Sequence, residues 1–323
     1  VIFQRLNRLQ NTLRVTLGNA ATGETRVVMT DRDETWVEVV EDLQWIENGK
    51  SFTWTSERDG WNHVYLVSRG SGAMKLITPV NFDVIRIAHI DKKGGWLYFT
   101  ASPEHAGQRY LYRVPLTGTG KAQRLTPAQQ PGTHAYDISP DARWAFHTYS
   151  GFGNPPRVEL IRLPGHQPVR TLVSNDELYK KLKTLKSSPV EFFSLDIGNN
   201  VLLDGWLMKP YNFDPHKKYP LLFYIYGEPA GQTVLDQWGR SNYLWHLMLT
   251  QQGYLVASID PRGTNGPKGR AWRKSIYKQI GILAPADHAA ATRKILEDWK
   301  FVDPERIGIW GWSYGGYFTC YAL

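Results

Sequence analysis

The chain has 323 residues, of which 42% are hydrophobic and 13% aromatic, and it carries a formal net charge of +8. This length predicts two domains, and the apolar content is ample for large cores. No stretch approaches about 18 consecutive apolar residues, which excludes a transmembrane helix. The chain shows no signal peptide and starts at Val1, which indicates a mature or truncated start.

Cysteine and histidine usage limits the chemistry that the chain can support. The one cysteine, Cys320, excludes internal disulfides and cysteine-based metal clusters. We expect its side chain to pack as a small buried hydrophobe. The nine histidines are scattered without metal-ligand spacing. We therefore expect neither a metal site nor a cofactor.

Positive charge gathers in two segments, residues 180–186 and residues 268–278. Neither segment is interleaved with stacking aromatic residues in the manner of a nucleic-acid-binding module. We interpret both as solvated surface charge and expect no nucleic-acid partner.

The first 170 or so residues predict an all-β repeat. A turn followed by a strand rich in aromatic residues and threonine recurs at residues 49–56, 94–102 and 141–150. Each leads to another strand some ten residues later. The central residues of these second strands are 47 and 48 residues apart: Tyr65, Tyr112 and Leu160. A period in the forties with several strands per unit is typical of β-propeller blades.

A further partial repeat is expected at the N-terminus, where residues 13–17 and 26–29 predict a hairpin. A closed propeller needs at least about four blades. The chain is therefore expected to carry only part of a propeller, with apolar edges and faces left unpaired. A β-sandwich with coincidental spacing is the alternative.

The composition changes near residues 179–189, and we place the domain boundary between residues 186 and 187. The second part begins with a hairpin that turns at Asn199 and Asn200. Strands and helices then alternate, which predicts a doubly wound, mostly parallel α/β sheet. The expected elements are strands at residues 219–226, 253–260 and 307–310 and a helix at 286–297. The fold predicted for the whole chain is a partial β-propeller (1–186) followed by a partial α/β-hydrolase domain (187–323).

Residues 306–317 predict a short apolar strand, a sharp turn that carries Ser313, and a helix. This order is the nucleophile elbow of an α/β-hydrolase. The neighbours two residues away from the serine must be small, and Gly311 and Gly315 meet that need. Gly316 is expected to let the helix pack close to the sheet. The alternative is a glycine-rich turn with an incidental serine.

At this point the motifs resemble a known family. The sequence Gly311-Trp312-Ser313-Tyr314-Gly315-Gly316-Tyr317 resembles the active-site signature of the prolyl oligopeptidase clan, most closely its dipeptidyl peptidase IV branch. Residues 226–232 resemble the tyrosine-bearing oxyanion loop, although Glu228 and Ala230 depart from its commonest sequence. Residues 260–263 resemble the Asp-x-Arg-Gly turn of the family, and residues 56–66 a propeller strand pair.

The resemblance implies a role for each motif residue. Ser313 would be the nucleophile, with the Tyr226 hydroxyl and the Tyr314 backbone N–H as oxyanion-hole donors. Trp312 and Tyr314 would line a pocket for a small P1 residue such as proline, or else pack the elbow. We expect Arg262 to brace the turn after its strand through hydrogen bonds.

The base that would activate Ser313 is expected outside the chain. In this fold the triad order is Ser, then Asp, then His, so both partners would follow residue 323. The chain alone is therefore predicted to be inactive. Asp287 and His288 precede the serine near a helix start, and we interpret Asp287 as a first-turn residue favoured by the helix dipole.

Three functions are open from the sequence. The first is a serine exopeptidase that releases N-terminal X-Pro or X-Ala dipeptides. The second is an acylaminoacyl peptidase or oligopeptidase of the same clan, and the third is a non-catalytic propeller binding module. The acidic pair that holds the substrate amine in the dipeptidyl branch is expected upstream of this chain, and Glu38, Glu41 and Asp42 are not assigned to it. The resemblance also allows a homodimer and favours a periplasmic or secreted location, with a cytoplasmic one open.

Overall fold

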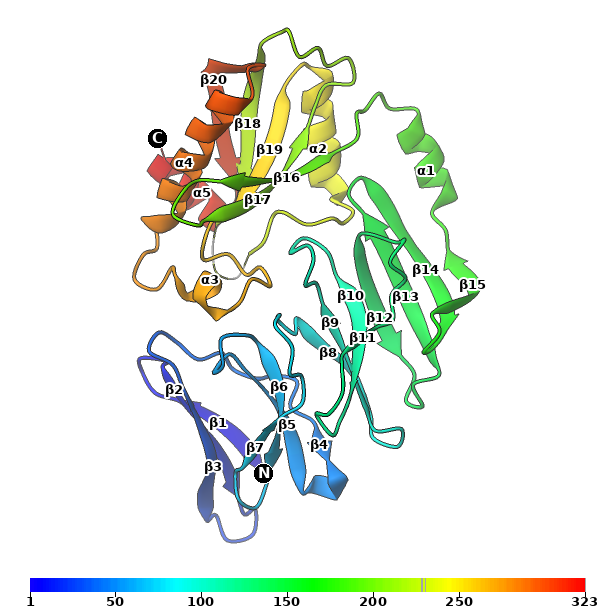
Figure 1. The fold of residues 1–323 in the computed structure, drawn as a ribbon, viewed down its shortest axis with the longest axis vertical. Coiled ribbons are helices and arrows are strands. Elements are labelled where there is room, and N and C mark those ends of the chain that lie inside the picture. The colour runs from blue at the N-terminus through cyan, green and yellow to red at the C-terminus, as the bar shows by residue number, and fades with distance from the viewer. Residues whose placement is uncertain (228, 230, 323) are drawn as a thin grey trace.

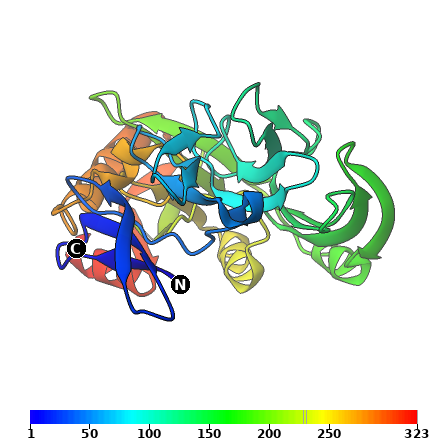
Figure 2. The same ribbon diagram turned by 90° about the horizontal axis from the view of Figure 1, so that it is seen from below.

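The computed structural model describes residues 1–322 except 228 and 230. Four antiparallel sheets follow one another along an arc, and a mixed sheet flanked by helices follows them in the chain (Figures 1 and 2). No helix in the described part of the chain has the length and apolar character that crossing a membrane requires.

The N-terminal part consists of one three-stranded and three four-stranded sheets. The first has β1 (Ile2–Leu6), β2 (Thr12–Gly18) and β3 (Thr25–Arg32). The second has β4 (Trp45–Ile46), β5 (Ser51–Ser56), β6 (His63–Ser68) and β7 (Met74–Leu76), with a short 3-10 turn, η1 (Glu47–Gly49), after β4. The third has β8 (Arg86–Asp91), β9 (Trp96–Ala101), β10 (Tyr110–Pro115) and β11 (Gln123–Arg124). The fourth has β12 (Thr133–Ile138), β13 (Trp144–Gly151), β14 (Asn154–Arg162) and β15 (Gln167–Val173).

The repeat read from the sequence matches this arrangement. Tyr65, Tyr112 and Leu160 lie on β6, β10 and β14, which are each the third strand of a four-stranded sheet. The predicted N-terminal hairpin is the β2–β3 pair. The partial propeller is confirmed, and the β-sandwich alternative is wrong because the strands form separate sheets, with one hydrophobic core between each adjacent pair.

Each of the three cores joins two adjacent sheets. Leu13 and Trp54 belong to the core between the first and second sheets. Leu97 and Phe99 belong to the core between the second and third sheets, and Ile161 to the core between the third and fourth. The outermost strand, β15, is exposed along its whole length, so apolar side chains lie in solvent at this end of the arc.

Helix α1 (Asp176–Lys183) follows the last propeller strand. Lys180, Lys181, Lys183 and Lys186 are all exposed, as expected for solvated charge. The domain boundary that we place between residues 186 and 187 falls in the segment that joins α1 to the mixed sheet.

The mixed sheet has the strand order β16-β17-β19-β18-β20. Its strands are β16 (Glu191–Asp196), β17 (Leu202–Met208), β18 (Tyr219–Ile225), β19 (Leu255–Asp260) and β20 (Val302–Gly311). β18 runs parallel to both β19 and β20, and β16 and β17 form the predicted antiparallel hairpin. Asn199 and Asn200 in its turn have φ of 54° and 59°, a region that asparagine tolerates.

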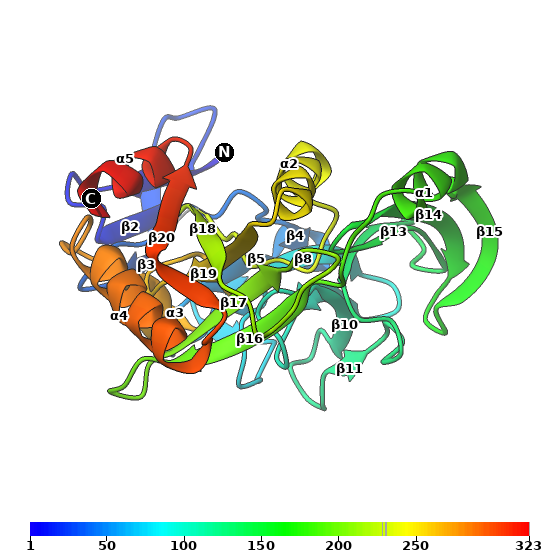
Figure 3. The same ribbon diagram turned by 90° about the horizontal axis from the view of Figure 1, so that it is seen from above.

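Helices cover both faces of this sheet (Figure 3). These helices are α2 (Arg240–Gln251), α4 (Leu283–Asp298) and α5 (Tyr314–Ala322), while α3 (Arg270–Lys274) lies between the sheet and the propeller part. Ala291 of α4 and Phe318 of α5 share one core with Phe223 of β18. Leu247 of α2 packs with Val256 on the other face. The doubly wound architecture predicted for residues 187–323 is confirmed.

Three local expectations are wrong. Helix α4 begins at Leu283, so Asp287 lies beyond its first turn and does not interact with the helix N-terminus as expected. The elbow strand β20 begins at Val302, well before the expected residue 307, and its pairing with β18 is irregular between Tyr219 and Leu221. Cys320 is exposed, because it lies on the face of α5 opposite Phe318.

Candidate active site

Ser313 occupies a sharp turn between β20 and α5. Its φ is 55°, in the left-handed region that costs a non-glycine residue about 1–3 kcal/mol. A Cβ on Gly311 would lie 2.5 Å from the carbonyl oxygen of Ile225, and one on Gly315 would lie 2.3 Å from the same oxygen. Both positions therefore exclude any side chain, as the sequence predicts.

Gly316 does not have the packing role expected of it. A Cβ at Gly316 would lie 3.4 Å from the Gly311 carbonyl oxygen, an ordinary contact distance. The close approach of α5 to β18 depends on Gly315 instead.

Tyr226 directly follows β18, and its ring lies beside that of Tyr314 with centroids 6.5 Å apart. The loop returns over this ring, since a Cβ on Gly231 would lie 2.0 Å from the Tyr226 Cδ1 atom. The structure thus brings together the two residues proposed to supply oxyanion donors. Glu228 and Ala230, whose departures from the family loop left the subsite shape open, lie outside the described residues.

The end of this loop is fixed by a buried carboxylate. Asp260, at the end of β19, accepts hydrogen bonds from the backbone N–H groups of Thr233 at 2.9 Å and Val234 at 3.1 Å. Burial raises the pKa of Asp260 to about 6, although these hydrogen bonds act in the opposite direction. Arg109, directly before β10, donates to the Gln232 Oε1 atom at 2.7 Å, and burial lowers the pKa of Arg109 to about 10.

The elbow itself projects into solvent. Trp312 is 82% exposed, Ser313 is exposed and Tyr314 is half-buried. No described residue forms a hydrogen bond with the Ser313 hydroxyl. Trp312 makes no ring contact with a described aromatic residue.

Arg262 and Asp287 form a bidentate ion pair, with the shorter contact 2.6 Å from Nη2 to Oδ1. The Arg262 backbone N–H also donates to Asp287 at 3.0 Å. Asp287 is 2% exposed and His288 is 4% exposed, with the imidazole packed between Phe223 and Phe318. Arg262 thus braces the turn after β19 as expected, while burial lowers the pKa of His288 to about 4.

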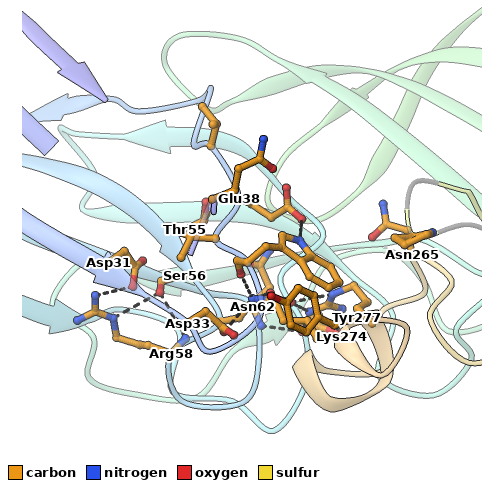
Figure 4. Close-up of a pocket in the computed structure, with 18 of the residues that line it drawn as sticks. Asp31, Asp33, Glu38, Thr55, Ser56, Arg58, Asn62, Asn265, Lys274 and Tyr277 are labelled. Atoms are coloured by element: carbon orange, nitrogen blue, oxygen red, sulfur yellow. Dashed lines mark hydrogen bonds and ion pairs between the residues drawn. The ribbon is translucent and has the colours of Figure 1, made fainter. Parts of the chain in front are cut away.

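A cavity of about 990 Å³ lies between the first two propeller sheets and the segment around α3 (Figure 4). Its wall includes Asn265, Lys274 and Tyr277 from the mixed-sheet part of the chain, and Pro229 from the tyrosine loop. Glu38 also lines it, and the indole N–H of Trp36 donates to the Glu38 carboxylate. Within the described residues, no three His, Cys, Asp or Glu side chains gather as a metal-ion site.

Comparisons with known proteins agree with this arrangement. Residues 1–156 match the family "Dipeptidyl peptidase IV (DPP IV) N-terminal region", and residues 241–323 match the "Prolyl oligopeptidase family". The dipeptidyl peptidase 4 of Arthroderma otae is 32% identical over 328 residues, which cover 99% of this chain and 41% of that protein. The dipeptidyl peptidase 4 of Trichophyton rubrum is 31% identical over 332 residues and 42% of its length is covered.

The crystal structure of Porphyromonas gingivalis dipeptidyl peptidase 4 aligns with the whole chain at a TM-score of 0.91 and 32% identity. The chain belongs to the prolyl oligopeptidase family, in its dipeptidyl peptidase IV branch. It covers 44% of the Porphyromonas gingivalis chain, and so spans less than half the length of these relatives.

The interpretation of residues 268–278 as solvated surface charge is wrong. Arg273 and Lys274 have side chains that are only 12% and 5% exposed. Both bind carboxylates of the propeller part, as does Arg270, whose guanidinium reaches Asp33 at 2.6 Å. Only Lys278 of this basic segment lies exposed without an ion pair to a described residue.

The sequence reasoning missed these contacts because the acids lie about two hundred residues earlier. One feature of the sequence could have indicated that these basic side chains are buried. Basic and apolar residues are mixed in 268–278, so basic side chains lie beside Ile276, which is buried.

Proposed function

We propose that the protein containing this chain is a serine exopeptidase that releases N-terminal X-Pro or X-Ala dipeptides from peptides. The observation that carries the proposal is the elbow, where Ser313 has φ of 55° beside the neighbouring rings of Tyr314 and Tyr226. The names of the relatives support the dipeptidyl specificity.

In the proposed reaction the Ser313 Oγ attacks the carbonyl carbon of the P1 residue while a histidine takes its proton. The negative charge develops on the former carbonyl oxygen, where the Tyr226 hydroxyl and the Tyr314 backbone N–H donate to it. Collapse of this intermediate breaks the C–N bond, and the histidine returns its proton to the leaving amine. Water then hydrolyses the acyl-enzyme and frees the dipeptide.

The triad Asp and His are proposed to come from sequence after residue 323, and the acidic pair from sequence before residue 1. The relatives' greater length supports this assignment. Trp312 and Tyr314 are proposed to shape the P1 pocket, and the cavity beside Pro229 to admit the peptide. The chain of 323 residues alone is proposed to be inactive, so it should not hydrolyse a peptide ester in a Ser313-dependent way.

The experiment uses the complete protein. Turnover of a free-amine Gly-Pro chromogenic amide is compared with that of its N-acetylated counterpart, for the wild type and for Ser313→Ala. Cleavage of only the free-amine substrate, lost in the variant, supports the proposal. Preference for the blocked substrate would move the protein to the acylaminoacyl peptidase or oligopeptidase alternative.

A wild-type protein that cleaves neither substrate would favour the third function considered from the sequence. If neither amide is cleaved by the wild type, the non-catalytic binding module becomes the better account. The homodimer that the family resemblance allows for the complete protein is tested separately, by its mass in solution from light scattering.

A further inference from the structure

Residues 261–282, which we name the strap segment, join the end of β19 to the start of α4. The middle of this segment contacts the propeller part. The Arg273 guanidinium donates to Asp83 at 2.7 Å and to Glu57 at 2.8 Å. The Lys274 ammonium reaches both Asp33 and Glu57 at 2.9 Å.

These contacts are largely removed from solvent. The side chains of Asp83 and Asp33 are 2% and 7% exposed, and that of Glu57 is 12% exposed. Ion pairs this buried are screened little by salt and are strongly directional when the arginine is bidentate. The strap segment is therefore fixed on the propeller at defined positions.

The backbone of the strap segment is fixed there as well. The Gly269 N–H donates to Asp83 at 2.8 Å, and the Arg270 N–H donates to the Gly60 carbonyl at 2.9 Å. Gly269 has φ of 86°, and a Cβ there would lie 3.2 Å from that same carbonyl oxygen. Side chain and backbone contacts thus act on the same short helix, α3.

Both ends of the strap segment contact the candidate active site. Near its start, the Asn265 N–H donates at 3.2 Å to the carbonyl of Gly231, the residue packed against the Tyr226 ring. Near its end, the Gly281 N–H donates at 3.3 Å to the Tyr314 hydroxyl. Gly281 has φ of 76°, and a Cβ there would lie 2.6 Å from the Tyr317 hydroxyl, so this approach is close.

We propose that Arg273 and Lys274 are positioning residues for catalysis: by holding the strap segment on the propeller, they place Tyr226 and Tyr314 for oxyanion binding. The inference rests on the function proposed above. The connection from the ion pairs of α3 to Gly281 is continuous, since hydrogen-bonded turns at Lys274–Tyr277 and Ile276–Gln279 link them. Ile276 between them is fixed in the core, where it is 1% exposed.

The proposal predicts a specific kinetic signature. Oxyanion donors act on charge that develops only in the transition state. Loosening the strap segment should therefore lower kcat and leave KM nearly unchanged. A displacement of roughly 1 Å at a catalytic group can cost about 10²-fold in rate.

The test compares Arg273→Met, Arg273→Lys and a matched control, Lys268→Met, in the complete enzyme. Lys268 lies in the same segment, but it bonds to Leu202 and Asp204 of the mixed-sheet part. We expect Arg273→Met to lose about 10- to 100-fold in kcat with KM within about twofold. Arg273→Lys should regain part of this loss, and Lys268→Met should behave as the wild type.

A double-mutant cycle with Tyr314→Phe provides the decisive readout. If Arg273 acts through the strap segment, the two losses in kcat are not additive, because Tyr314→Phe already removes the contact with Gly281. Additive losses, an unchanged kcat in folded Arg273→Met, or a loss in KM alone would overturn the proposal. If Arg273→Met does not fold, the same cycle is run with Arg273→Lys. A wild-type enzyme without Ser313-dependent turnover would instead contradict the proposed function.

Discussion

A Cβ atom on Gly315 would lie 2.3 Å from the carbonyl oxygen of Ile225. This close approach is between the first turn of α5 and the last residue of β18, which directly precedes Tyr226. The nucleophile turn and the tyrosine loop are therefore held at a separation that only glycine permits.

The first prediction is that Gly315→Ala displaces α5 and the Ser313 turn. Because the clash is with backbone, the variant should lose at least about 1–3 kcal/mol of stability. It should also lose most of its reactivity towards a fluorophosphonate probe. Thermal unfolding and labelling rates of the complete enzyme measure both effects. Gly316→Ala is the control, and it should change each only slightly, since its Cβ would lie 3.4 Å from Gly311.

The second prediction concerns the Tyr226 hydroxyl. If it donates to the oxyanion, Tyr226→Phe should lower kcat by about 10²–10³-fold with little change in KM. The ring contact with Tyr314 is kept in this variant, so the melting temperature should stay close to that of the wild type. Equal kcat for the variant and the wild type would remove Tyr226 from the mechanism.

The third prediction concerns the ion pair between Arg262 and Asp287. Asp287 is 2% exposed, and Asp287→Asn leaves the guanidinium without a charged partner. Breaking such a pair typically costs about 3–5 kcal/mol, and the half-exposed position of Arg262 places the expected loss nearer 2 kcal/mol. Chemical denaturation measures it. Asp303→Asn, which removes a carboxylate paired with the exposed Arg306, should produce a clearly smaller change.

The fourth prediction is a loss of stability in acid to which two buried histidines of the fourth propeller sheet contribute. His134 Nδ1 and His147 Nε2 lie 2.8 Å apart, and both imidazoles are at most 2% exposed. They stack on Tyr149 and Tyr136, with ring centroids 4.7 Å and 4.8 Å apart. Burial lowers the pKa of His134 from 6.5 to about 4 and that of His147 to about 3.

The unfolded chain binds these protons more readily than the folded chain does. The stability that these two histidines contribute should therefore be constant above about pH 6.5 and fall as the pH drops towards 4, by about 1.4 kcal/mol per pH unit for each histidine that stays neutral. The melting temperature between pH 8 and pH 4 measures this. His147→Gln should make the dependence less steep, and His216→Gln, at an exposed position, should not. An unchanged slope in His147→Gln would contradict the assignment.

Local patterns allowed much of the fold to be predicted. The spacing of Tyr65, Tyr112 and Leu160 identified equivalent strands, because each sheet repeats the same hairpins in the same order. The elbow was predictable for a similar reason, since the constraints on Gly311 and Gly315 act between residues that are close in sequence or on an adjacent strand.

Contacts between distant segments could not be predicted in this way. Arg273 and Asp83 are 190 residues apart, and no local pattern indicates that their side chains form a buried ion pair. The same holds for Cys320, whose helical position alone does not say which face of α5 meets the sheet. In such cases the packing of whole elements decides the environment of the side chain.

The ion pairs of the strap segment have a consequence for protein engineering. Their acidic members come from residues 33–83 and their basic members from residues 270–274, on opposite sides of any junction placed near residue 186. A chimera that takes its propeller from one relative and its catalytic part from another would combine charges that did not evolve together. Such a chimera would need Asp33, Glu57 and Asp83 transferred together with Arg270, Arg273 and Lys274 as a single unit.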